Sequence, residues 1–183
     1  MTSSSPWVTA TPAVVAAARV TIIYFLLYYA FLMFQTYSKL FILARERRSK
    51  KGHGIDWRVV LGLERYNYLD PELSKIKYGG DDGSGSRDPL SILGDRIVGN
   101  TLEQMMPFLV GLWGSAATAS GGDESAGSIY CLGTIYILSR LFYPWCFSKG
   151  SPFILISTVP GYMVIWWQLI TAAMALQSQP TAR

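Results

Sequence analysis

The sequence predicts an all-α integral membrane protein, a bundle of four transmembrane helices in a single domain covering residues 1–183. Half of the residues are hydrophobic and only 15% are charged, against about 25% in an ordinary soluble domain. The apolar residues gather in four long runs, and most charged residues lie between these runs. Each run reaches the roughly 20 residues that a helix needs to cross the hydrocarbon core of a bilayer.

The four predicted spans cover about residues 14–43, 97–119, 129–147 and 153–176. They lack the period-two alternation of barrel strands, and only helices or closed barrels can cross a bilayer. The first run is long for a simple span, so we expect it to tilt or to project beyond the membrane. In the second run, Gly111, Gly114 and Ser115 are small residues at helix-contact spacing, which we interpret as ordinary close packing between helices.

The distribution of basic residues predicts the orientation in the membrane. Eleven of the sixteen Lys and Arg residues lie from Arg45 to Arg96, in the connection between the first two runs. Lys149 lies in the third connection, whereas the second connection contains two acids and no base. By the positive-inside rule, the first and third connections face the cytosol and both termini face the opposite side. The segment RERRSKK is therefore interpreted as a topology signal at lipid headgroups, and no nucleic-acid partner is expected.

The first connection, about residues 45–96, is longer than a minimal bundle needs. Within it, IDWRVVLGLERYNYLDPEL predicts a short interfacial helix, and YGGDDGSGS predicts a flexible loop. Pro89 directly after Asp88 predicts the start of the helix that continues into the second run.

The cysteine and histidine residues predict neither a disulfide nor a metal site. Cys131 and Cys146 fall in the same run, and the rise per residue of a helix separates them by more than about 20 Å. They cannot bridge each other, and we expect two buried, unreactive thiols. His53 is the only histidine, and no metal-ligand spacing accompanies it.

Polar side chains lie at helical spacing at the start of the second run. Arg96, Asn100 and Glu103 occupy positions i, i+4 and i+7 and therefore share one stripe. Charged groups at membrane depth are costly unless they pair or face a protein interior or a watery cavity. The stripe is therefore a candidate functional site.

A second stripe in the third run contains Tyr136, Arg140, Tyr143 and Phe147. Antiparallel neighbouring helices place Arg140 and Tyr143 at about the depth of the first stripe, near the cytosolic surface. Together the two stripes suit a small anionic, peptide-like ligand, because Arg binds carboxylates in bidentate fashion and Glu holds an ammonium group or an N–H group. The alternative is that Glu103 and Arg140 pair across the bundle and only fix the register of the helices.

Three motifs resemble those of the MAPEG family, the membrane-associated proteins in eicosanoid and glutathione metabolism. R-x-x-x-N-x-x-E-x-x-x-P-x-L, from Arg96 to Leu109, resembles the signature of the family's second helix. R-L-F-Y, from Arg140 to Tyr143, is similar to the R-x-x-Y or R-x-x-H motif of the third helix. LFILARERR is similar to the Arg-rich end of the first helix. The resemblance covers all four runs in order and topology.

The resemblance implies a homotrimer of four-helix bundles in the endoplasmic reticulum, with mitochondrial or plastid membranes as alternatives. It implies that glutathione binds between adjacent subunits at the cytosolic side. Carried over by position, the glutathione-binding residues are Arg96, Asn100, Glu103, Arg140 and Tyr143. Arg140 and Arg45 are the residues that the resemblance suggests as catalytic stabilisers of the glutathione thiolate.

Two functions remain open. The first is a glutathione-dependent transferase or peroxidase acting on lipophilic electrophiles or hydroperoxides. The second is a non-catalytic relative that presents lipid to an enzyme or serves as a subunit of a larger membrane complex. The second is favoured by three features. GSPFILISTVPG contains no Arg where the family's leukotriene-synthesising enzyme has one, Phe147 replaces a second Tyr, and the first connection is long.

Overall fold

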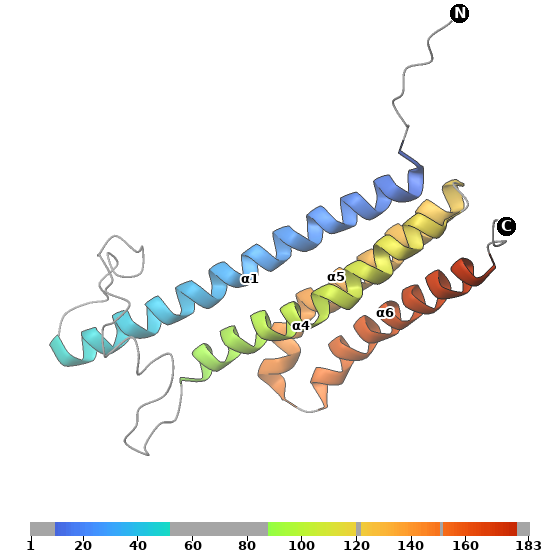
Figure 1. Ribbon diagram of the computed structural model, residues 1–183. Helices are drawn as coiled ribbons and strands as arrows, with labels where there is room; N and C mark the ends of the chain where they lie inside the picture. Colours follow the sequence, from blue (N-terminus) through green and yellow to red (C-terminus); the bar gives the residue numbers. More distant parts are fainter. Residues whose placement is uncertain (1–9, 52–87, 120–121, 151, 179–183) are drawn as a thin grey trace, which may run out of the picture. The chain divides into compact units, whose positions relative to one another are not determined.

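The computed structural model describes residues 10–51, 88–119, 122–150 and 152–178. In these ranges the chain forms the helices α1 (Pro12–Lys51), α4 (Pro89–Thr118), α5 (Asp123–Lys149) and α6 (Phe153–Gln177) (Figure 1). The helices coincide with the four apolar runs and extend beyond most of their ends, so the prediction of an all-α protein is confirmed for the described residues. The predicted interfacial helix and the Gly- and Asp-rich loop lie outside the described residues.

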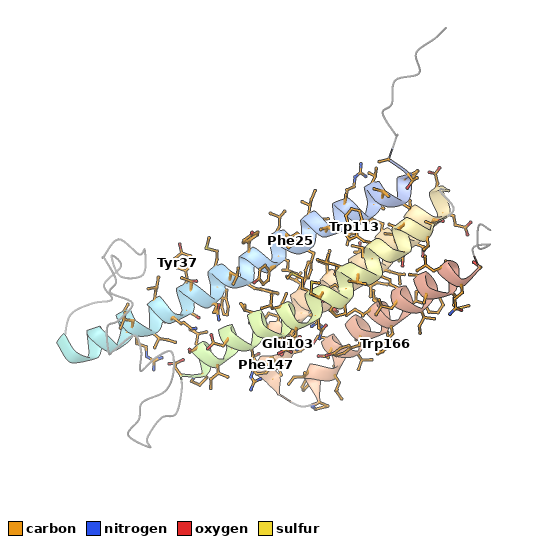
Figure 2. The ribbon with its side chains drawn as sticks, viewed as in Figure 1. Phe25, Tyr37, Glu103, Trp113, Phe147 and Trp166 are labelled. Carbon is orange, nitrogen blue, oxygen red and sulfur yellow. The ribbon has the colours of Figure 1, made fainter. Side chains whose placement is uncertain are left out.

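Within the described part, two segments are long and apolar enough to cross a membrane, Pro12–Arg45 and Phe153–Gln177. Only 28% of the most apolar window of each is buried, whereas a core helix of a soluble protein is mostly buried. Large hydrophobic side chains such as Phe25, Tyr37 and Trp166 are instead exposed (Figure 2). These features support a membrane protein, while the passage of α4 and α5 through the bilayer stays a prediction.

The start of α4 has the cap that the sequence predicts. The Leu90 N–H donates to Asp88 Oδ1 at 2.8 Å, and the N–H groups of Ser91 and Ile92 donate to the Asp88 carbonyl oxygen at 2.9 and 3.1 Å. Pro89 occupies the first helical position, where its missing N–H costs no hydrogen bond. Asp88 therefore fixes where the helix begins.

The chain divides into two compact units, and the first comprises residues 1–26 and 103–183. Within this unit α5 packs along α6. The Phe108 and Tyr136 rings stack with centroids 3.8 Å apart, and Tyr24 lies 5.3 and 5.8 Å from these two rings. The core combines these aromatic rings with small and aliphatic side chains: Ala13, Ala16, Ala17, Val20, Tyr24, Phe108, Leu112, Ala116, Ile129, Tyr136, Val164 and Ile165.

Glycines let the helices of the first unit approach closely. A Cβ atom at Gly133 of α5 would lie 2.5 Å from a methyl group of Val20 of α1. A Cβ atom at Gly114 of α4 would lie 3.3 Å from the Ala172 Cβ atom of α6. Gly114 therefore lies at a helix contact, as the small-residue spacing of the second run predicts.

The second unit, residues 27–102, has polar contacts between α1 and α4. Lys39 Nζ lies 2.6 Å from Asp95 Oδ1, and Gln35 Nε2 donates to the same oxygen at 2.7 Å. Nearer the start of α4, Arg45 Nη1 lies 3.7 Å from Asp88 Oδ2, and the Arg45 side chain is 69% exposed. Of these two ion pairs, the one between Lys39 and Asp95 is therefore shorter and less exposed.

Candidate functional site

Arg140 lies inside the protein, on α5, with only 1% of its surface exposed. Its Nη2 atom donates to the Ser157 carbonyl oxygen of α6 at 3.2 Å. Its Nε atom donates to Ser139 Oγ at 3.4 Å, and that hydroxyl donates to the Tyr136 carbonyl oxygen at 2.6 Å. These hydrogen bonds hold a cation at a defined position between α5 and α6.

Two tyrosine rings flank this guanidinium group. The Arg140 Cζ atom lies 5.5 Å from the ring centroid of Tyr136 and 5.5 Å from that of Tyr143. Both distances fall within the range of cation–π attraction, which is stronger when the cation is desolvated. Since Tyr136 also stacks on Phe108, the position of Arg140 is tied to the aromatic part of the core.

Gly161 of α6 makes the room that Arg140 occupies. A Cβ atom at this position would lie 2.8 Å from Arg140 Nη2 and 3.0 Å from Ser139 Oγ. Neither Gly161 nor Ser157 was predicted from the sequence as part of the site. The only sequence signal was a small-residue pair four positions apart, which is common in membrane helices and does not identify an arginine site.

The predicted stripe on α4 presents polar groups outward. Arg96 and Glu103 are exposed, and Asn100 is half-buried. Arg96 and Asn100 belong to the second unit, whereas Glu103, Arg140 and Tyr143 belong to the first. Their convergence on one pocket therefore stays a prediction, as does the pairing of Glu103 with Arg140.

Prolines follow two of the predicted site residues by one helical turn. Pro107 and Pro144 both lie inside their helices. Because proline has no N–H group, Pro107 cannot donate to the carbonyl of Glu103, and Pro144 cannot donate to that of Arg140. Each of these two carbonyls therefore lacks its usual helical donor. The sequence contained this signal, because a proline four residues after a polar residue is visible without a structure.

The remaining predicted residues have distinct surroundings. Tyr143 is 5% exposed, and its ring centroid lies 5.8 Å from that of Phe147. Arg45 lies in the second unit beside Asp88, and its catalytic role stays a prediction.

The expectation of two buried thiols is wrong for Cys131, which is exposed, whereas Cys146 is buried. Among the described residues, no three His, Cys, Asp or Glu side chains form a group that could hold a metal ion.

The comparison with protein families identifies the chain. The MAPEG family matches residues 25–178, nearly the whole chain. No curated protein and no solved structure matches the sequence. The matched range includes the α4 stripe as well as Arg140 and Tyr143. On this match, the chain belongs to the MAPEG family.

Proposed function

We propose that this protein is a membrane-bound transferase or peroxidase that uses glutathione to modify lipophilic electrophiles or hydroperoxides. Membership of the MAPEG family supports a glutathione-related role. The observation that carries the proposal is the buried Arg140 guanidinium, which hydrogen bonds and two tyrosine rings hold in place. A cation fixed in a site of low dielectric stabilises a nearby thiolate more strongly than a solvated cation does.

The outward-facing stripe on α4 supplies the binding groups in this proposal. Arg96 binds a carboxylate of glutathione, Glu103 holds its ammonium group, and Asn100 pairs with a peptide group. A single chain leaves Arg96 and Glu103 exposed on a helix that we place in the membrane. Such charges need a ligand or a neighbouring subunit. This supports a site completed between adjacent subunits of a homotrimer at the cytosolic face.

In the transferase reaction the glutathione thiol first loses its proton to solvent. The thiolate sulfur then attacks an electrophilic carbon of a substrate that enters from the bilayer, and the leaving group departs with the bonding electron pair. In the peroxidase reaction two glutathione molecules are oxidised to the disulfide, while the hydroperoxide is reduced to an alcohol and water. Both reactions need the thiolate, and we assign its stabilisation to Arg140, with Arg45 as a second cation.

The test uses the full chain, purified in detergent. Isothermal titration measures glutathione binding, ultraviolet difference spectra measure the thiolate, and turnover of a chloro-nitrobenzene substrate measures conjugation. We expect Arg140→Ala to lower kcat/KM by about a hundredfold, since one preorganised electrostatic group commonly contributes this much. Arg19→Ala, which removes an exposed arginine near the start of α1, should leave activity unchanged. Wild-type protein that neither binds glutathione nor conjugates the substrate would exclude the proposal.

A second function, a non-catalytic member of the same family, is favoured by one observation. No residue of α6 (Phe153–Gln177) is Lys or Arg, so this helix provides no basic side chain to stabilise a thiolate. Such a protein would present lipid to an enzyme or join a larger membrane complex. Glutathione binding without thiolate formation, together with a stable hetero-complex after gentle solubilisation, would favour this function over the enzyme.

A further inference from the structure

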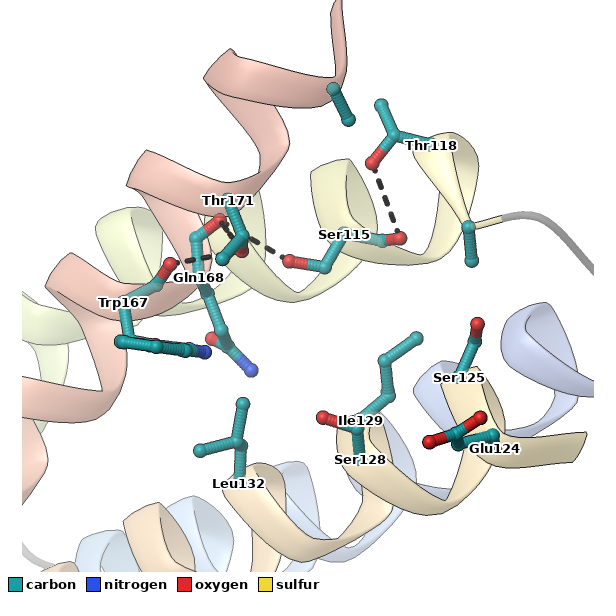
Figure 3. A pocket seen from close by; sticks show the side chains of 12 residues that line it. Ser115, Thr118, Glu124, Ser125, Ser128, Ile129, Leu132, Trp167, Gln168 and Thr171 are labelled. Carbon is teal, nitrogen blue, oxygen red and sulfur yellow. Dashed lines mark hydrogen bonds between the residues drawn. The ribbon is translucent and has the colours of Figure 1, made fainter.

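A cavity of about 430 Å³ lies in the first unit, between α4, α5 and α6 (Figure 3). It lies toward the carboxyl ends of α4 and α6 and the amino end of α5. The positive-inside prediction places this end on the side of the membrane away from the basic connection. The cavity is therefore separate from the proposed glutathione site. Its lining combines apolar and polar side chains, including Ser115, Ser128, Leu132, Trp167, Gln168 and Thr171.

The distinctive group in this cavity is the amide of Gln168. The residue is 1% exposed, and neither its Nε2 nor its Oε1 atom has a hydrogen-bond partner. Figure 3 shows this side chain extending from α6 into the space above Leu132. A buried amide without partners is costly, and native structures rarely leave one in that state. A neutral amide offers two donors on nitrogen and an acceptor oxygen beside them.

The surroundings hold Gln168 in this position. Ser115 Oγ and Thr171 Oγ1 donate to its backbone carbonyl oxygen at 3.2 and 3.1 Å. A Cβ atom at Gly111 would lie 3.1 Å from Gln168 Cβ and 3.4 Å from its Oε1 atom. The glycine thus makes room for the amide beside α4. Because the hydroxyl groups of Ser115 and Thr171 donate to this backbone carbonyl, the side-chain amide of Gln168 is available to another partner.

We propose that this cavity binds the uncharged polar head of a lipid-like molecule, a primary amide or a protonated carboxylic acid. Either head presents a donor and an acceptor side by side and can form two antiparallel hydrogen bonds with the Gln168 amide. The apolar chain of the ligand would lie along Leu132 and the exposed ring of Trp167. The carboxylate of Glu124, which also lines the cavity, disfavours an ionised acid.

The test is binding of a long-chain primary amide, carrying bromine on its acyl chain, to the full chain in detergent. Bromine near Trp167 should quench tryptophan fluorescence, and Trp167→Phe should remove most of the saturable quenching. The matched methyl ester accepts hydrogen bonds but donates none, so it should bind about tenfold more weakly. The matched carboxylic acid should bind at low pH and lose affinity as it ionises. Equal binding of the amide and the ester would overturn the proposal, as would absence of saturable quenching.

The Gln168→Met variant tests whether the Gln168 amide binds a ligand or only stabilises the fold. It keeps the length of the side chain and removes the unpartnered donors and acceptor. We expect the thermal unfolding midpoint of the ligand-free protein to stay or rise, and the dissociation constant of the amide to increase about tenfold. Gln177→Met, at the exposed end of α6, is the control and should change neither value. A Gln168→Met protein that is less stable and binds the amide normally would show that the amide is structural and overturn the proposal.

Discussion

The Arg140 guanidinium donates a hydrogen bond to the Ser157 carbonyl oxygen at 3.2 Å and thereby joins α5 to α6. Gly161, one helical turn after Ser157, makes this contact possible because a Cβ atom there would lie 2.8 Å from Arg140 Nη2. The position of the cation therefore depends on a glycine of the neighbouring helix. This dependence can be tested without changing the charge of the arginine.

Gly161→Ala should displace the Arg140 guanidinium from Ser157. The atom that the new methyl group meets is the far end of a flexible side chain, so the helices need not separate. We expect the free energy of unfolding to fall by about 1.5–3 kcal/mol, the range for a hydrogen bond that involves a charged group. Glutathione thiolate formation should fall by more than binding does, as measured by difference spectra and titration calorimetry. Unchanged thiolate formation in a folded variant would contradict the role of Arg140.

Gly133→Ala should destabilise the first unit more strongly. The new methyl group would lie 2.5 Å from a branched Val20 side chain, and overpacking of this kind costs about 1–3 kcal/mol. Gly127→Ala on the same helix is the control, because nothing lies within 4 Å of its Cβ position. There the higher helix propensity of alanine should add up to about 1 kcal/mol. Thermal unfolding in detergent measures both, and equal midpoints would contradict close contact between α1 and α5.

Asp95→Asn should weaken the contact between α1 and α4 in the second unit. The asparagine keeps an acceptor for Gln35 but removes the charge beside Lys39, which lies 2.6 Å away. We expect a loss of about 1 kcal/mol, because both side chains are only partly exposed. The comparison is Arg45→Gln, which removes a longer and more exposed pair and should cost less than about 0.5 kcal/mol. A larger effect at Arg45 would reverse this ranking.

Asp88→Ala should fray the start of α4. It removes the side-chain oxygen that accepts the Leu90 N–H, and loss of such a cap costs about 1 kcal/mol. Asp88→Asn keeps a capping oxygen and removes only the charge facing Arg45. Hydrogen exchange of the first turn of α4 should therefore rise in the alanine variant and stay near wild type in the asparagine variant. An equal rise of exchange in the two variants would show that the charge, and not the cap, fixes the helix start.

The positions of the helices were predictable because their signals are local. An apolar run of sufficient length predicts a span, and Asp88 with Pro89 predicts the start of α4 without reference to any other helix. The exposure of Cys131 was not predictable in this way. Within a uniformly apolar run, the side of the helix that faces the protein depends on which helices lie beside it.

For the candidate site too, some residues were predictable from the sequence and others were not. The spacing of Arg96, Asn100 and Glu103 on one helix follows from the sequence, as does the presence of Arg140 and Tyr143 on another. The groups that hold Arg140 do not, because Ser157 and Gly161 contribute a backbone carbonyl and an absent side chain. Neither contribution has a chemical signature in the sequence.

By itself the sequence determined an all-α membrane protein, its helices and the resemblance that the family match confirms. These depend on hydrophobicity, charge and spacing along the chain. Only the tertiary structure decided that Arg140 is buried and that the Gln168 amide is left without a partner in a cavity. Burial and hydrogen bonding depend on distances between helices, which no single helix encodes.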